Sequence, residues 1–173
     1  TINPLESHIL LLDTMSNSIG DVRKYEGERD QEGRPDGTGR AEYDGSTDVY
    51  GRSEYTGQWS QGQWHGKGHL CWVSGAHYQG DFSRGSLHGQ GQMVWEFGAR
   101  YEGHYVQGQR SGEGTYMYPL DDKFGRHRYK GSWSQNKKNG HGVMEWTSGQ
   151  TYEGNWENGL RSGIGTQTWP EGA

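Results

Sequence analysis

Aromatic residues and glycines alternate with polar residues in a pattern that recurs along most of the chain. In the stretch YTGQWS, the polar residues Thr56 and Gln58 separate Tyr55, Gly57 and Trp59. Residues two apart point to the same face of a β-strand. The pattern therefore predicts a strand with two rings and a glycine on one face and polar side chains, exposed to water, on the other.

The same unit starts at six tyrosines. The intervals between them are 30, 23, 23, 28 and 23 residues, so the unit is 23 residues long and the first and fourth copies carry insertions. A fixed period of this length is typical of a repeat protein. The copies are residues 25–54, 55–77, 78–100, 101–128, 129–151 and 152–173, and residues 1–24 form a separate segment.

Each copy contains a second segment with strand character, such as the one around GKGHLCW, which follows a turn such as SQGQWH. Glycine weakens a strand unless another group must approach its backbone closely. We expect that group to be a neighbouring ring lying over the bare backbone. The fold class predicted is all-β: an elongated single-layer antiparallel sheet of tandem β-hairpins, each stabilised mainly by its neighbours.

The composition indicates a core made of rings. Leu, Ile, Val and Phe number 21 in 173 residues, a proportion typical of disordered chains, but the 22 aromatic residues argue against disorder. Cys71 is the single cysteine, so no internal disulfide forms, and a reducing cytoplasmic location fits best. The net charge of −5 gives no reason to expect nucleic acid as a partner.

Motifs of catalysis and cofactor binding are missing from the sequence. It contains no G-x-x-x-x-G-K, G-x-S-x-G or H-E-x-x-H pattern. His65 and His88 share a turn position beside a glycine, where a histidine shapes the turn more often than it binds a metal. We expect a non-enzyme without a cofactor or a metal site.

The first 24 residues lack the repeat pattern and predict a helix of about 12 to 16 residues. Asn3, Pro4 and Glu6 have the order of an N-cap, a first-turn proline and a capping-box glutamate, and Gly20 can end the helix. Leu5, Ile9 and Leu12 form an apolar stripe, with Leu11, Met15 and Ile19 beside it, and residues 20–24 form a linker. The helix either caps the sheet or occupies the groove that a partner helix would otherwise fill.

These motifs resemble the MORN repeat, Y-E-G-x-W-x-x-G-x-x-x-G-x-G. The match covers residues 25–173; the first copy departs most, with Arg29 in place of the second aromatic, and the fifth has Asn136 where glycine is usual. The resemblance implies an elongated sheet with a groove and a non-catalytic scaffold role, as in radial spoke heads, membrane-bridging junctional proteins and accessory regions of lipid kinases and a methyltransferase. The first copy is similar to the opening copy of radial spoke head proteins, which implies cytoskeletal or ciliary association.

Two functions fit these features. The first is a protein-interaction scaffold whose groove binds a partner helix or extended peptide through aromatic residues of the middle copies, which are favoured at binding hot spots. The alternative is that the same rings are the contacts that hold the repeats together. The candidates are Tyr78, Phe82, Tyr101, Tyr105, Tyr129 and Trp133.

The second function is a phospholipid-associated module, or an accessory repeat region of a larger multidomain protein. Its candidate patch for anionic lipid is the basic insertion of the fourth copy, for which the alternative is a solvated loop. The patch comprises Lys123, Arg126, Arg128 and Lys130, and the nearby Asp121 and Asp122 are expected to be solvated. Self-association through the N-terminal helix or the sheet ends is a further expectation.

Overall fold

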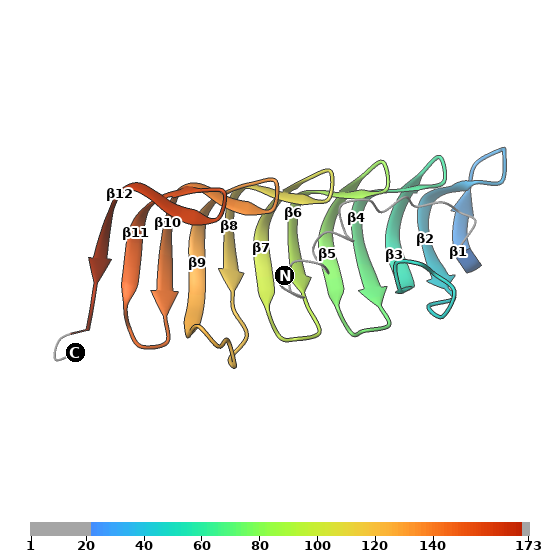
Figure 1. Ribbon diagram of the computed structural model, residues 1–173. Helices are drawn as coiled ribbons and strands as arrows, with labels where there is room; N and C mark the ends of the chain where they lie inside the picture. Colours follow the sequence, from blue (N-terminus) through green and yellow to red (C-terminus); the bar gives the residue numbers. More distant parts are fainter. Residues whose placement is uncertain (1–21, 171–173) are drawn as a thin grey trace.

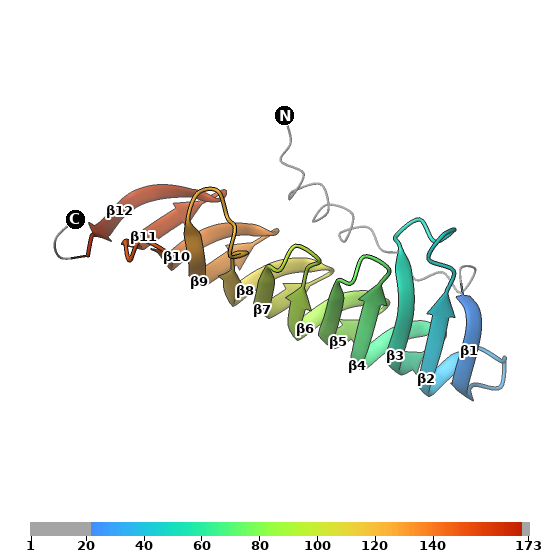
Figure 2. The same cartoon turned by 90° about the horizontal axis from the view of Figure 1, so that it is seen from below.

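The computed structural model describes residues 22–170, which form one elongated antiparallel sheet of twelve strands (Figures 1 and 2). The strands pair in sequence order, so the predicted single-layer sheet of tandem hairpins is confirmed. They are β1 (Val22–Arg29), β2 (Pro35–Tyr43), β3 (Arg52–Ser60), β4 (Gln63–Trp72), β5 (His77–Ser83), β6 (Ser86–Val94), β7 (Arg100–Val106), β8 (Gln109–Met117), β9 (Arg126–Ser134), β10 (Lys137–Trp146), β11 (Thr151–Glu157) and β12 (Leu160–Thr168).

The predicted N-terminal helix lies outside the described residues. Its expected linker, residues 20–24, overlaps the sheet, because β1 already begins at Val22. This part of the linker prediction is wrong, since Lys24 and Val22 pair with β2. Within residues 22–170 no helix has the length and apolar character needed to cross a membrane.

A row of glycines crosses the whole sheet, one on each strand. Cross-strand pairing brings them together in the order Gly27, Gly39, Gly57, Gly68, Gly80, Gly91, Gly103, Gly114, Gly131, Gly142, Gly154 and Gly165. The pairing register shifts beside this row within the hairpins, and Figure 1 shows each strand bending near its middle. The bend needs a bare backbone: a Cβ placed on Gly80 would lie 2.5 Å from the Cα of Gly91.

The tyrosine that starts each repeat covers this glycine row. The Tyr55 hydroxyl donates to the Gln58 carbonyl at 2.8 Å, and the other five tyrosines make the same bond three residues on. A Cβ on Gly68 would lie 2.5 Å from the Tyr55 hydroxyl oxygen. The expected ring over the glycine backbone is thus confirmed, and the paired glycine of the next strand is a second group that approaches closely.

The rings form a continuous edge-to-face ladder along the sheet. Tyr55 packs against Trp59 of its own hairpin at 5.0 Å and against Phe82 of the next hairpin at 5.2 Å between ring centroids. The same alternation continues to Tyr152 and Trp156, at 5.4 Å. Each such pair contributes roughly 0.5–1.5 kcal/mol beyond its area burial. Because every other pair joins two hairpins, each repeat is stabilised by its neighbours.

Hairpin tips close the core by folding back over the preceding hairpin. The Gly85 N–H donates to the Trp64 carbonyl at 3.0 Å, and Gly108 donates to Leu87 at 2.9 Å. A single-layer sheet can bury its rings because bent strands and folded-back tips enclose them. Tyr55, Trp64 and Tyr78 are therefore fully buried.

Candidate functional site

The six rings proposed to contact a partner all lie in this core. Each has at most 6% of its surface exposed, and all belong to one buried cluster. Their packing favours the alternative that these rings hold the repeats together, because a partner could reach them only by displacing the hairpin tips. Direct contact through them stays a prediction. They are Tyr78, Phe82, Tyr101, Tyr105, Tyr129 and Trp133.

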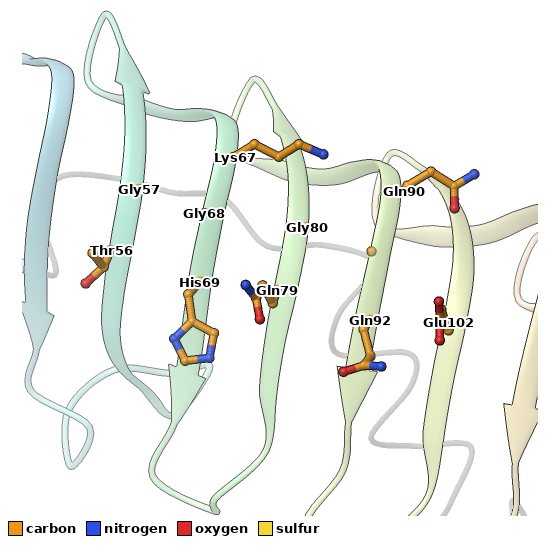
Figure 3. Close-up of a pocket in the computed structure, with 11 residues that line it drawn as sticks. Thr56, Gly57, Lys67, Gly68, His69, Gln79, Gly80, Gln90, Gln92 and Glu102 are labelled. Carbon is orange, nitrogen blue, oxygen red and sulfur yellow. The ribbon is translucent and has the colours of Figure 1, made fainter.

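The opposite face carries a polar groove that runs across β3 to β7 (Figure 3). It encloses about 660 Å³ and has a floor formed by the backbone of the glycine row. Its other lining residues are Thr56, Lys67, His69, Gln79, Gln90, Gln92 and Glu102.

Two rows of polar side chains flank the glycine floor. Cross-strand pairing places Thr56, His69, Gln79, Gln92 and Glu102 in one row. A second row, which contains Lys67 and Gln90, lies across the glycines from the first. The sequence pattern correctly predicts that Gln79 and Thr56 face water.

The side chains of the row with Lys67 and Gln90 are held by contacts to neighbouring side chains, whereas part of the row with Gln79 and Gln92 is not. Lys67 Nζ lies 2.6 Å from Asp81 Oδ1, and Gln90 Nε2 lies 3.2 Å from His104 Nδ1. Partial burial by itself would raise the pKa of the Asp81 carboxyl, but hydrogen bonds from Lys67 and the Gln90 N–H lower it overall. Within residues 22–170, the Gln79 and Gln92 side chains make no hydrogen bond to protein.

These groups suit the recognition of a neutral polar ligand. A glutamine amide offers both donors and an acceptor, as a peptide backbone does. Lys67 and Glu102 bring opposite charges to the two sides of the floor, so the groove has no single-sign field. The described residues contain no group of three or more His, Cys, Asp or Glu side chains that could hold a metal ion.

The basic insertion differs from the expected open cationic patch. Arg126 Nη2 lies 2.6 Å from Asp122 Oδ1, and Arg128 Nη2 lies 2.5 Å from Glu145 Oε1. The expectation that Asp122 is solvated is wrong, because 4% of its side chain is exposed. Lys123 and Lys130 are exposed, so two of the four predicted cations have carboxylate partners and two face water.

The insertions of the first and fourth copies contain the same loop motif, which the repeat pattern alone does not reveal. The segments DVYGR (48–52) and DKFGR (122–126) share the pattern D-x-[YF]-G-R. In each loop the arginine Nε–H donates a hydrogen bond to the aspartate carboxylate, over 2.8 Å from Arg52 to Asp48 and 3.1 Å from Arg126 to Asp122. The glycine adopts a left-handed φ of 64° or 63°. Aligning the two insertions with each other would have revealed this ion-paired turn.

Asn136, which departs from the usual glycine, is explained by Arg110. Asn136 has a φ of 66°, a left-handed conformation that asparagine tolerates. Its side-chain oxygen accepts the Arg110 backbone N–H at 2.8 Å and its carbonyl accepts Arg110 Nη2 at 2.8 Å. The guanidinium is buried and lies 4.4 Å from the centre of the Trp133 ring. The unusual Asn136 and the buried Arg110 therefore depend on each other.

The comparison with protein families agrees with this architecture. The model of the MORN repeat matches residues 55–77, 78–98, 101–119, 129–151 and 152–173, more than half of the chain. The first copy is outside these matches, although β1 and β2 form its hairpin and Tyr25 makes the usual bond to Glu28. A search of curated proteins finds no match.

Proposed function

Because the chain belongs to the MORN repeat family, we propose that it is a non-catalytic scaffold that binds a protein segment in the polar groove of β3–β7. Repeats of this family often bind proteins or membranes, and they are generally non-catalytic modules. The observation that carries the proposal is the glycine-floored groove, in which the Gln79 and Gln92 side chains make no hydrogen bond within residues 22–170.

The groove width favours an extended segment over a helix. The flanking rows stand one residue before and one after each glycine, so their Cα atoms are roughly 7 Å apart along a strand. A helix with its side chains is about 10–12 Å across, whereas an extended chain fits between the rows. The rigid floor adds to affinity, because little conformational freedom of the scaffold is lost on binding.

A peptide selected from a random library by binding to the wild-type protein tests this proposal. The double variant Gln79→Arg/Gln92→Arg fills the groove with bulk and charge and should weaken binding at least about tenfold, or 1.4 kcal/mol. The control, Gln63→Arg/Gln107→Arg, adds the same charge at exposed hairpin tips. Selected peptides that bind both variants as well as the wild type would refute the groove as the binding site.

A second candidate is binding to anionic lipid through the loop between β8 and β9. The observation that favours it is the exposure of Leu120 and Phe124 beside Lys123. Sedimentation with phosphatidylserine vesicles at low and physiological salt tests it, because such binding weakens with screening. The variant Lys123→Ser/Lys130→Ser should reduce sedimentation and leave peptide binding intact. If the wild type does not sediment at low salt, this function is excluded.

The scaffold proposal includes a cytoplasmic location with cytoskeletal or ciliary association. Its support is the likeness of the first copy to radial spoke head proteins. A fluorescently tagged chain should label axonemes in ciliated cells; diffuse signal in the same cells would contradict the ciliary part.

A further inference from the structure

The two ends of the sheet differ in the charge of their outer strands. β1 and β12 lie at opposite ends of the array (Figure 1), and within residues 22–170 each pairs with one strand only. Five of the eight residues of β1 are charged, and Lys24 Nζ lies 2.6 Å from Glu26 Oε1. Arg161 is the one charged residue among the nine of β12. Charged side chains keep the open edge of a sheet from pairing with another chain, so β1 has this protection and β12 lacks it.

Large apolar side chains are exposed on and beside this nearly uncharged strand. Leu160 is 72% exposed, Ile164 is 89% exposed, and Trp169, which follows β12 directly, is 60% exposed. Ile164 has the repeat position of Lys67, on the polar face, and Trp169 has that of Trp72, on the ring face. The last hairpin therefore presents apolar surface on both faces of an unpaired edge, a feature typical of interaction sites.

Ile164 departs from the residues at its position in the earlier copies. There, each second strand carries a polar residue opposite a polar residue of the next hairpin, as in the pair of Lys67 and Asp81 with 2.6 Å between their charged atoms. Leu160 likewise stands where earlier copies have Gln63, Ser86, Gln109 and Lys137. A strand that pairs with β12 should thus carry an uncharged residue opposite Ile164.

The ring face of β12 has the opposite departure, because a polar residue replaces an apolar one. Four earlier second strands each place an apolar side chain opposite the tyrosine that starts the next hairpin; they are Leu70, Met93, Tyr116 and Met144. At this position β12 has Gln167, whose Oε1 accepts a hydrogen bond from Arg161 Nη1 at 2.7 Å. The composition of β12 is therefore not matched to a further hairpin of the usual pattern.

The glycine row restricts the register in which a strand can add to β12. Every neighbouring pair of strands matches one glycine of the row with the next, so a strand that continues the row places a glycine opposite Gly165. In this register, β1 of a second copy would put Glu28 opposite Ile164 and Glu26 opposite Thr166, and a carboxylate buried against an aliphatic side chain is unfavourable.

β12 of a second copy fits the same register without a charge at these positions. Gly165 then pairs with Gly165 of the second copy, and Ile164 of each copy faces Thr166 of the other. Both residues are β-branched, the class of side chain that strands favour. The strand β12 is thus self-complementary, whereas β1 is not complementary to it.

We propose that β12 is a self-association surface, and that two copies of the chain pair their β12 strands antiparallel about a two-fold axis at Gly165. The axis is perpendicular to the sheet, so the ring faces of both copies lie on one side. Because both copies use the same surface, the assembly closes at two and leaves the charged β1 strands at its outer ends. The inference does not rest on the proposed peptide groove, but the dimer would carry two such grooves on one continuous face.

Sedimentation equilibrium of the whole chain tests the self-association. A single added strand pair is a small interface, so we expect a dissociation constant on the order of 10 µM and use concentrations from about 1 to 200 µM. The average mass should rise from one chain to two and go no further. A chain that stays monomeric over this range would overturn the proposal. A mass that grows beyond two chains would mean open head-to-tail growth and would overturn the symmetric pairing.

Two matched substitutions locate the surface. Ile164→Lys adds a charge to the edge and should weaken association at least about tenfold. The control, Leu120→Lys, adds the same charge at a side chain that is 99% exposed in the loop between β8 and β9, and it should leave association unchanged. Both positions are exposed, so each variant should melt as the wild type does. Wild-type association of Ile164→Lys, or an equal loss in the two variants, would refute β12 as the surface.

A mixing experiment tests the register. Thr166→Asp also adds a charge to the edge and should weaken self-association when it is alone. In a mixed dimer of Ile164→Lys and Thr166→Asp, the introduced lysine lies opposite the introduced aspartate, and the unchanged threonine of one copy still faces the unchanged isoleucine of the other. The equimolar mixture should therefore associate one to one and more tightly than either variant alone. A mixture that associates no more tightly than the separate variants would refute this register.

Discussion

The glycine row makes a sharp prediction at Gly80, because a single added carbon there meets backbone. In Gly80→Ala, the new Cβ would lie 2.5 Å from Gly91 Cα, 2.5 Å from the Tyr78 hydroxyl oxygen and 2.6 Å from the Gln90 carbonyl oxygen. The φ of Gly80 is not positive, so conformational strain of alanine adds nothing to the cost. The whole effect therefore measures the close approach.

The magnitude follows from two contributions. Overpacking against backbone costs about 1–3 kcal/mol, and displacing Tyr78 weakens its 3.0 Å hydrogen bond to the Asp81 carbonyl, worth about 1 kcal/mol. We expect Gly80→Ala to lower the free energy of unfolding by about 3 kcal/mol, and Gly80→Val by more. For a chain of this length that is a fall in Tm of roughly 6–12 °C.

Gly98→Ala is the matched control in a thermal melt followed by circular dichroism. Gly98 has a φ of 87° and nothing within 4 Å of its added Cβ, so it incurs backbone strain of about 1–2 kcal/mol without a collision. Gly80→Ala should melt clearly below Gly98→Ala. If the Gly80 variant melts within about 2 °C of the wild type, the close-packed glycine row does not hold the sheet together.

Three further predictions concern the ion-paired and cationic side chains. Asn136→Ala removes the side-chain oxygen that accepts the Arg110 N–H, and it should lower the free energy of unfolding in urea by about 2 kcal/mol. The control Gln63→Ala, at an exposed position, should change it negligibly. Equal effects of the two substitutions would show that the Asn136–Arg110 contact does not stabilise the fold. Burial alone would raise the pKa of the Asp122 carboxyl, but the Arg126 hydrogen bond lowers it overall. The ionised carboxylate therefore stabilises the folded state at every pH above the pKa of an unfolded aspartate, and this stabilisation is lost as the pH falls through the lower pKa of Asp122 in the folded state. We therefore expect acid to speed the amide exchange of the 119–125 loop, measured by NMR, in the wild type and not in Asp122→Asn. Acid-induced exchange that persists in the variant would show that protonation of Asp122 is not its cause. Burial, with Arg126, Arg161 and Arg110 nearby, lowers the pKa of Lys138 to about 8. Between about pH 8 and 10.5 Lys138 is then neutral in the folded state and still charged in the unfolded state, so the free energy of unfolding should rise with pH over this range. Lys138→Met should raise the Tm at pH 7 and raise it less at pH 10; an equal gain at both would show that the charge is not the cause.

The hairpin architecture was predictable because it depends on local chemistry repeated six times. A ring, a glycine and a ring at spacings of two specify one face of a strand, and Tyr55, Gly57 and Trp59 show this directly. The same spacing predicted that Thr56 and Gln79 face water. Side-chain alternation is a property of the strand itself, so it is readable without knowing how the sheet bends.

The location of the candidate site was decided by the tertiary structure. Alternation shows that Tyr78 and Phe82 share a face, but it does not show that the bent strands and the hairpin tips of the next repeat close that face. This closure makes the rings a core and leaves Gln79 and Gln92 to line the groove.

The ion pairs of the insertions are also tertiary or loop-specific features. The sequence alone determined a repeat array whose strands carry rings and glycine on one face and polar side chains on the other. It did not determine that Asp122 neutralises Arg126, or that Asn136 supports Arg110 from the next hairpin, because these contacts depend on how loops and tips fold back. Local periodicity sets which side chains share a face, and packing between hairpins sets which face remains free to bind.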